Sequence, residues 1–214
     1  MPQSVPISDT PNVIFADDYI LVAEKPAGLL SVPGRLPENK DCLVTRLQAQ
    51  YPDALTVHRL DMATSGLMVF ARGADAHRAL SQAFADRRVA KRYIAVVAGQ
   101  LEGDGEVDLP LITDWPNRPR QMVDRAIGKP SLTRYRAVAQ GDGTSRVDLE
   151  PITGRSHQLR VHMMAIGHPI IGDVFYAPPD AQAMSDRLLL HAQSLALPHP
   201  RTGAALEFQS QAPF

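Results

Sequence analysis

The residues best suited to chemistry in this chain form one short segment, HRLDMATSG, at positions 58–66. Its carboxylate, Asp61, lies between an arginine and a group of turn-forming residues, directly before an apolar stretch that predicts a strand over 67–71. Loops at strand edges often carry catalytic side chains, because the strand beneath them is rigid. The simpler interpretation is that Asp61 only closes an Asx-turn with Thr64 and Ser65, and the segment taken alone favours it.

A second polar segment, TGRSHQLRVH, covers positions 153–162 and predicts the start of a helix over 157–166. Leu159, Met163 and Ile166 recur at helical spacing and should face the core. Arg160 is then held close to a buried surface, where a cation needs an acidic partner. We expect Asp61 as a candidate for that partner.

Metal and cofactor chemistry is not favoured by the remaining residues. His157, His162 and His168 with Asp173 offer ligand types, but the histidines lack the i, i+4 spacing of helical zinc ligands. The only cysteine, Cys42, excludes an internal disulfide and a zinc site of several thiolates, and we expect it to be a small buried residue. The spacing therefore predicts no metal site, and there is no phosphate-binding glycine loop or dinucleotide fingerprint.

The elements that must position these segments are mostly strands. Periodicity predicts strands over 12–15, 20–23, 67–71, 93–98, 132–138, 146–149, 188–192 and 205–208, and helices over 43–51, 74–87 and 157–166. We expect Ser156 to cap the third helix, Gly167 to end it in a left-handed conformation and Pro169 to prevent its continuation. This order lacks regular strand-helix alternation and predicts an α+β fold with a mixed, largely antiparallel sheet and flanking helices. Two irregular stretches, 25–35 and the surface loop 113–119, are expected to line a binding cleft.

The amino-acid composition alone does not identify the binding partner of this protein. The 214 residues are 44% apolar, enough for one large or two small domains, and the formal net charge is −1. Positive charge is concentrated in residues 72–92 and 113–160, which suits either a solvated surface or contact with phosphates. The first dozen residues do not resemble a secretory signal, and no apolar run approaches the length of a membrane span. We therefore expect a cytoplasmic protein without a membrane partner.

Four ordered motifs resemble the RluA family of pseudouridine synthases: EKPAGLLSVPG, HRLDMATSGL, KRYIAVVAG and ITGRSHQLRVH. The resemblance runs from about residue 13 to near the C-terminus, and VPGR and DWPNRP are similar to the short members of the large-subunit synthase A type. It implies a pseudouridine synthase catalytic domain over 12–214 around a central RNA-binding cleft, after a flexible tail over 1–11. Many relatives carry a small RNA-binding domain before the catalytic one, and here we expect the catalytic domain to find its RNA unaided.

The resemblance also implies an activity, the isomerisation of uridine in RNA, which needs no cofactor. By match to the family, Asp61 is the nucleophile, attacking C1′ of the sugar or C6 of uracil, or else deprotonating C2′. Arg160 is its cationic partner. Tyr93 stacks on the uracil and helps to remove the C5 proton. Arg59 enters the RNA stack in place of the extruded base.

The remaining site predictions are less specific. Ile152 and Leu159 are predicted as the apolar wall of a uracil pocket, although core packing explains them equally well. We predict further RNA or phosphate contacts, from motif position or from charge and loop location, at His58, Arg155, Arg35, Arg87, Arg88, Arg118 and Arg120.

The expected substrate is an RNA hairpin loop, in which bases unstack at low cost. The resemblance implies two such RNAs, 23S rRNA and the tRNA anticodon stem-loop, with no obligate protein partner. Two alternatives remain open. One is a non-catalytic RNA-binding protein on the same fold, in which Asp61 is structural. The other is a metal-dependent hydrolase that uses the histidines.

Overall fold

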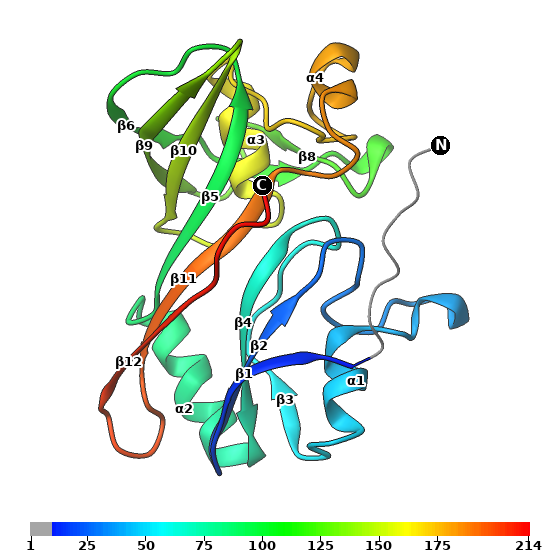
Figure 1. Ribbon diagram of the computed structural model, residues 1–214, viewed down its shortest axis with the longest axis vertical. Helices are drawn as coiled ribbons and strands as arrows, with labels where there is room; N and C mark the ends of the chain where they lie inside the picture. The colour runs from blue at the N-terminus through cyan, green and yellow to red at the C-terminus, as the bar shows by residue number, and fades with distance from the viewer. Residues whose placement is uncertain (1–9) are drawn as a thin grey trace. The chain divides into compact units, whose positions relative to one another are not determined.

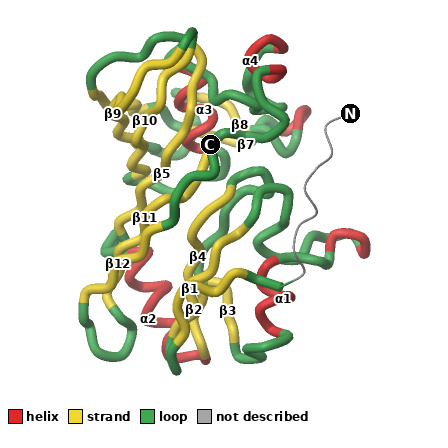
Figure 2. The backbone as a smooth tube through the Cα atoms, viewed as in Figure 1, coloured by secondary structure: helices red, strands yellow, loops and turns green. Residues whose placement is uncertain are grey.

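The computed structural model describes residues 10–214, and these form two compact units. Unit 1 comprises residues 10–91 and 192–213, and unit 2 comprises residues 92–191 with Phe214. Most of the described chain is strand or loop (Figure 2). The predicted α+β class with a largely antiparallel sheet is confirmed. One catalytic domain over 12–214 stays a prediction, and most of the predicted tail over 1–11 lies outside the described residues.

The sheet of unit 1 is organised around β4 (Ser65–Arg72), which is buried along almost its whole length. β2 (Ile20–Lys25) runs antiparallel along one edge of β4, with Ile20 opposite Ala71 and Lys25 opposite Gly66. The continuous apolar run of β4 is typical of a strand that is covered on both faces. The other strands are β1 (Asn12–Ala16) beside β2, β3 (Ala54–Thr56) beside the end of β4, and β11 (Leu190–Pro198) with its antiparallel partner β12 (Ala205–Gln209).

The long helix of unit 1, α2 (Gly73–Ala85), packs against β3 and β4 (Figure 1). Ala76, Leu80 and Ala83 form its buried face and belong to a core cluster with apolar residues of β2, β4 and β11. The predicted helices over 43–51 and 74–87 are both confirmed, each ending earlier than expected. The shorter helical elements are α1 (Leu43–Gln48) and the 3-10 turn η1 (Pro37–Asn39).

Unit 2 contains an antiparallel sheet in the order β5 (Ala90–Ala98), β10 (Thr144–Pro151), β9 (Leu132–Gly141) and β6 (Asp104–Asp108). Strands β5 and β11 each have residues in both units. The helix α3 (Gln158–Ala165) packs against β9 and β10 (Figure 1). The remaining elements are β7 (Leu111–Thr113), the 3-10 turn η2 (Trp115–Asn117), β8 (Gln121–Val123) and α4 (Pro179–Ala183).

The capping residue predicted for α3 was wrong. The N-cap is His157, in a left-handed conformation with φ 54°, and Ser156 is exposed. The loop before the helix is instead fixed by Gln158, whose Oε1 accepts hydrogen bonds from the Arg155 amide at 3.0 Å and the Thr153 hydroxyl at 2.7 Å. Gln158, the first residue of α3, thus fixes the preceding loop, and no side chain of the N-cap residue caps the first-turn amides. The predicted C-terminal signal is confirmed, because Gly167 has φ 87° and ends the helix.

The surface loop predicted over 113–119 is confirmed, because residues 114–120 join β7 to β8 as the largely exposed tip of a β-hairpin. Strands β3, β7 and β8 have only three residues each, too few to show an alternation of apolar and polar side chains. No helix in residues 10–214 is both long and apolar enough to span a membrane.

Replacing Gly66 by alanine should destabilise the protein by at least about 2 kcal/mol. Gly66 has φ 112°, and a Cβ there would overlap the backbone of Ala192 in the neighbouring strand β11. Gly73→Ala is the matched control, because Gly73 also has a positive φ, 78°, but has open space around it. We expect it to cost about 1 kcal/mol. Chemical unfolding of both variants measures the difference, and equal losses would contradict the close approach at Gly66.

Candidate active site

Asp61 lies in a tight turn directly before β4. The backbone amide of Thr64 donates a hydrogen bond to the Asp61 carbonyl at 3.1 Å, which confirms a turn at this position. The preceding residue, Leu60, is buried, whereas the following residue, Met62, is largely exposed. The Asp61 side chain is itself partly buried, so its carboxylate lies at the border between the core of unit 1 and its surface.

A buried lysine anchors the residue that follows Asp61. The side chain of Lys25 is only 1% exposed, and its Nζ donates to the carbonyls of Pro26 at 2.7 Å, Leu29 at 2.8 Å and Met62 at 2.9 Å. An ammonium has three hydrogens to donate and is costly to bury without acceptors, so this set of carbonyls compensates its desolvation. The Gly28 amide also donates to the Met62 carbonyl, at 2.8 Å. The loop after β2 is thereby fastened to the Asp61 turn.

A buried serine anchors the residue that precedes Asp61. The Ser31 hydroxyl donates to the Leu60 carbonyl at 2.7 Å and accepts from the Leu60 amide at 3.1 Å. Asp61 is thus held through its neighbours on both sides, by Ser31 and by Lys25. The sequence analysis did not identify either anchor. Leu60 lies 29 residues after Ser31, and Met62 lies 37 residues after Lys25, so neither contact is visible in the local sequence.

His58, predicted to contact RNA, has an internal role in unit 1. Its Nε2 accepts a hydrogen bond from the Val69 amide at 3.0 Å, and its ring stacks on Phe84 at 4.8 Å between centroids. Burial, with a smaller contribution from the positive charge of Lys91, lowers the pKa of His58 to about 3. The ring is therefore neutral at physiological pH, with its proton on Nδ1. A contact between His58 and RNA stays a prediction.

In unit 2, Arg160 is a fixed, buried cation. Its side chain is 3% exposed and forms a two-pronged ion pair with Asp173, Nε to Oδ2 and NH2 to Oδ1, both at 2.7 Å. The rings of Phe175 and Tyr176 lie 5.2 and 5.1 Å from the guanidinium carbon. Such a fork holds the planar guanidinium in one orientation. The acidic partner of Arg160 within unit 2 is thus Asp173, and a pairing with Asp61 stays a prediction.

The Arg160 cluster is tied to two neighbouring segments. The Tyr176 hydroxyl accepts from the Gln121 amide at 2.8 Å and lies 2.6 Å from Nδ1 of His157. The Tyr176 hydroxyl thus joins β8 to the residue that precedes α3. Arg120 lies over the Phe175 ring at 5.8 Å, so Arg120 and Arg160 share one aromatic neighbour. The positive φ of His157 is a strained conformation of the kind that concentrates at functional sites.

The predicted uracil-contacting residues also lie in unit 2. Tyr93 is in β5, opposite Leu149 of β10, and is partly buried. Ile152 directly follows β10 and is partly buried, and Leu159 in α3 is buried. Tyr93 and Ile152 are partly accessible and Leu159 is not, which suits either a lined pocket or ordinary packing, so the uracil pocket stays a prediction.

The predicted RNA-contacting arginines are exposed in both units. Arg155 and Arg88 have weak local contacts, to the Pro130 carbonyl at 3.3 Å and to Asp86 at 3.5 Å. Arg87 has φ 58° at the end of α2, a left-handed position that usually takes glycine. Exposed ion pairs are worth little, so these cations remain available to phosphates. The exposed set is Arg35, Arg59, Arg87, Arg88, Arg118, Arg120 and Arg155.

The histidines considered as metal ligands are engaged elsewhere. His162 contacts the Thr133 hydroxyl and the Leu109 carbonyl through its two ring nitrogens, both at 2.9 Å. His168 uses Nδ1 on the Ala98 carbonyl at 2.9 Å. Residues 10–214 contain no group of three or more histidine, cysteine, aspartate or glutamate side chains placed to hold a metal ion.

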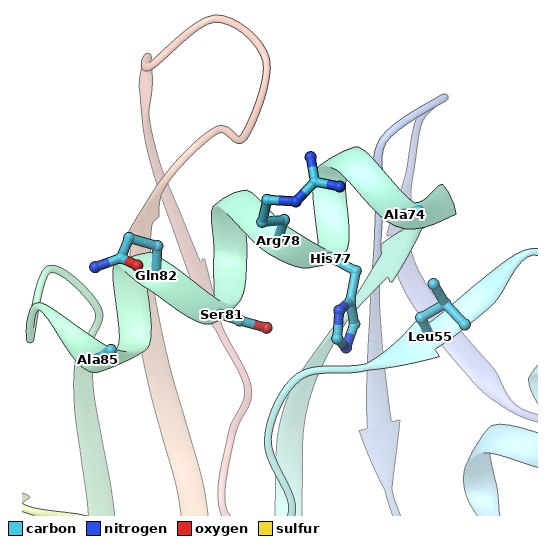
Figure 3. A pocket seen from close by; sticks show the side chains of 7 residues that line it. All are labelled: Leu55, Ala74, His77, Arg78, Ser81, Gln82 and Ala85. Carbon is cyan, nitrogen blue, oxygen red and sulfur yellow. The ribbon is translucent and has the colours of Figure 1, made fainter.

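A surface hollow lies along α2 in unit 1, with His77 directed toward Leu55 of β3 (Figure 3). His77 Nε2 lies 3.1 Å from the Thr56 carbonyl. The hollow contains none of the residues predicted for chemistry, and it is lined by Leu55, Ala74, His77, Arg78, Ser81, Gln82 and Ala85.

Comparison with known proteins assigns the chain to a family. The family described as RNA pseudouridylate synthase matches residues 19–165. Two proteins named dual-specificity RNA pseudouridine synthase RluA are each 55% identical to this chain. The match to the protein from Escherichia coli K12 covers 94% of this chain and 93% of that protein. The match to the protein from Yersinia pestis covers 94% of this chain and 99% of that protein. The solved structure of human RNA pseudouridylate synthase domain containing 1 has a TM-score of 0.83 and 28% identity, and covers 99% of this chain and 87% of its own.

Replacing Lys25 by methionine should destabilise the protein by about 3 kcal/mol or more, because buried carbonyls lose their donor. Amide exchange at Gly28, which reports on the loop after β2, should accelerate. The matched control is Lys40→Met, because Lys40 is exposed and donates to a single carbonyl, that of Gly34. It should cost no more than about 0.5 kcal/mol. Equal unfolding midpoints for the two variants would show that Lys25 does not hold the loop.

The lowered pKa of His58 predicts a loss of stability in acid. The folded state binds a proton to this ring less readily than the unfolded state, whose ordinary pKa is 6.5. The stabilisation is therefore complete above about pH 6.5 and is lost as the pH falls toward the folded pKa of about 3, by at most about 1.4 kcal/mol per pH unit. His58→Gln keeps an acceptor but does not titrate, so its stability should fall less between about pH 7 and about pH 5. Parallel stability curves would contradict the account.

Proposed function

This chain belongs to the RNA pseudouridylate synthase family, and from that premise we propose that Asp61 is the nucleophile with which it isomerises uridines in RNA hairpin loops. Membership makes the protein an isomerase that acts on uridine in RNA. We further propose two substrates, 23S rRNA and the tRNA anticodon stem-loop.

The proposed reaction is balanced without any co-reactant. The bond between C1′ of ribose and N1 of uracil breaks, the detached base turns, and C5 bonds to C1′. C5 then loses its proton and N1 carries one, so no atom or electron is gained or lost. A single carboxylate suffices, because rejoining the bond removes the need for the acid and base pair that hydrolysis of a glycosidic bond uses. No cofactor is proposed.

The observation that carries this proposal is the anchoring of Asp61. A nucleophile contributes most when its position is set before the substrate arrives. The buried side chains of Ser31 and Lys25 bind the backbone of Leu60 and Met62, the two residues that flank Asp61. A carboxylate that served only to close a surface turn would not need a buried ammonium to hold its neighbour.

Arg160 and Tyr93 are proposed as the partners of Asp61. Arg160 is a permanent cation whose orientation is fixed by Asp173 and by two aromatic rings, so it supplies a positive charge without reorganisation during the reaction. Tyr93 offers a flat ring for the uracil and a hydroxyl that takes part in removing the C5 proton. Ile152 and Leu159 complete the apolar wall of the proposed uracil pocket.

Arg59 is proposed to replace the extruded base in the RNA stack. It is exposed and lies two residues before Asp61, in the segment that Ser31 anchors at Leu60. A planar guanidinium suits a gap between stacked bases. The cost of extrusion is lowest in a loop, which supports hairpin loops as the substrate form.

Dual specificity is supported by relatives that are 55% identical over nearly their whole lengths and whose names describe it. A 23S rRNA loop and a tRNA anticodon stem-loop are the two substrates that the family resemblance implies. Both RNAs are cytoplasmic in bacteria, so we propose that the enzyme acts in the cytoplasm.

Asp61→Asn should abolish pseudouridine formation, by on the order of 10⁴-fold, while RNA affinity stays within a few-fold of the unmodified protein. The test incubates each protein with EDTA and with unmodified tRNA and rRNA hairpins, followed by carbodiimide labelling and primer extension. Asp53→Asn is the matched control, because Asp53 is an exposed carboxylate of the same unit and pairs with Arg72. It should retain full activity.

Each outcome of this experiment distinguishes the proposed function from one of the alternatives. Modification in both RNAs that survives EDTA and requires Asp61 supports the proposal and eliminates a metal-dependent hydrolase. Modification of one RNA alone refutes dual specificity. A folded protein that binds both hairpins but modifies neither is a non-catalytic RNA-binding protein on this fold.

A further inference from the structure

An aromatic side chain is displayed to solvent at the tip of the β7–β8 hairpin, residues 114–120. Trp115 is 65% exposed, and the guanidinium carbon of Arg118 lies 4.6 Å from its ring centroid. Indole rings are usually buried, because they carry a large apolar surface. One face of this ring is occupied by a cation, and the extent of exposure leaves further ring surface open to a ligand.

The hairpin tip is held by hydrogen bonds on both sides of Trp115. The Asp114 amide donates to the Arg120 carbonyl at 3.0 Å, and the Arg120 amide donates to the Asn117 carbonyl at 3.1 Å. The Asn117 side chain donates to the Asp114 carboxylate at 2.9 Å. The tip is thus preorganised, so a ligand would not have to order it.

The charge around the tip favours an anionic partner. Residues 114–129 hold four cations, Arg118, Arg120, Arg125 and Lys129, against two aspartates. Both carboxylates accept hydrogen bonds inside turns, Asp114 from Asn117 and Asp124 from the Ala126 and Ile127 amides at 2.8 and 3.0 Å. This segment is therefore basic in a chain whose formal net charge is −1.

We infer that Trp115 and Arg118 form a stacking platform for an unpaired base of the substrate RNA, distinct from the uridine that reacts. Aromatic rings flanked by arginines bind single-stranded nucleic acid by stacking on the base and attracting the phosphates. An apolar protein partner fits less well, since a cation occupies one face of the ring and the surrounding segment is basic. The inference rests on RNA being the substrate but not on the role of Asp61.

The platform is connected to Arg160 within unit 2. At the base of the hairpin, Leu111 packs with Val161 of α3 and with Tyr176. The amide of Gln121 in β8 donates to the hydroxyl of Tyr176, whose ring lies beside Arg160. A base bound on Trp115 would therefore be held in a fixed position relative to Arg160. Because stacking tolerates every base, the platform positions the RNA without reading its sequence.

Trp115 is the only tryptophan in the chain, so its fluorescence reports on this site alone. We expect titration with the tRNA or rRNA hairpin to quench the Trp115 emission. The RNA concentration at half-quenching should agree with the dissociation constant obtained from the anisotropy of the same RNA carrying a fluorescent label. Emission that stays constant while anisotropy shows saturation would overturn the inference.

Three variants separate stacking from charge. Trp115→Ala should weaken hairpin binding by about tenfold or more, and Trp115→Phe should restore most of the affinity. Both should leave the salt dependence of binding unchanged. Arg125→Gln is the matched control, because Arg125 is an exposed cation of the same segment. It should reduce the slope of log affinity against log salt by about 0.7 to 0.9.

Kinetics distinguish this inference from the proposed function. Trp115→Ala should raise the KM for the hairpin with little change in kcat, because the base that the platform is inferred to hold is not the uridine that reacts. Quenching by RNA in a protein that forms no pseudouridine would refute the proposed function and leave the platform in place. An active enzyme in which Trp115→Ala binds RNA as tightly as the unmodified protein would refute the platform alone.

Discussion

The buried ammonium of Lys25 is the constraint on which the Asp61 site depends. Burying this cation requires acceptors for its hydrogens, and the three carbonyls that it contacts belong to two loops far apart in sequence. The register of the sheet explains how these loops meet. Lys25 ends β2 directly opposite Gly66 at the start of β4, so the chain leaving β2 and the chain entering β4 lie at the same end of the antiparallel pair. Gly66 contributes to the packing at this end of the sheet, because the absence of a side chain lets the backbone of Ala192 in β11 approach closely.

Unit 2 uses a different buried cation for a related purpose. The guanidinium of Arg160 is planar and forms two parallel hydrogen bonds with one carboxylate, that of Asp173, whereas the compact ammonium of Lys25 satisfies separate carbonyls. Lysine therefore joins loops, and arginine fixes a charge in one orientation. Removing one partner of either arrangement leaves a buried polar group without compensation, which is much more costly than losing a surface ion pair.

How much could be predicted from sequence depends on how local each interaction is. The long strands follow from apolar periodicity, and β4 was recognisable as an uninterrupted apolar run. The Asp61 turn was visible in its residue types. Lys25 and Ser31 were not identified, because their roles arise from contacts across dozens of residues. The capping prediction for Ser156 failed because His157, in a left-handed conformation, stands between Ser156 and the first residue of the helix. His58 similarly looked like part of a polar surface motif, whereas tertiary packing places its ring nitrogen on the backbone of β4.

The most direct test of the central claim follows the hydrogen that the reaction must displace. Hairpin RNA carrying tritium at C5 of uridine is incubated with the purified protein in EDTA, and tritium in water is counted together with RNA length. The account predicts one tritium released for each modified uridine, with the RNA chain intact and no release by Asp61→Asn. Retention of all tritium by RNA that is bound to the folded protein would contradict it.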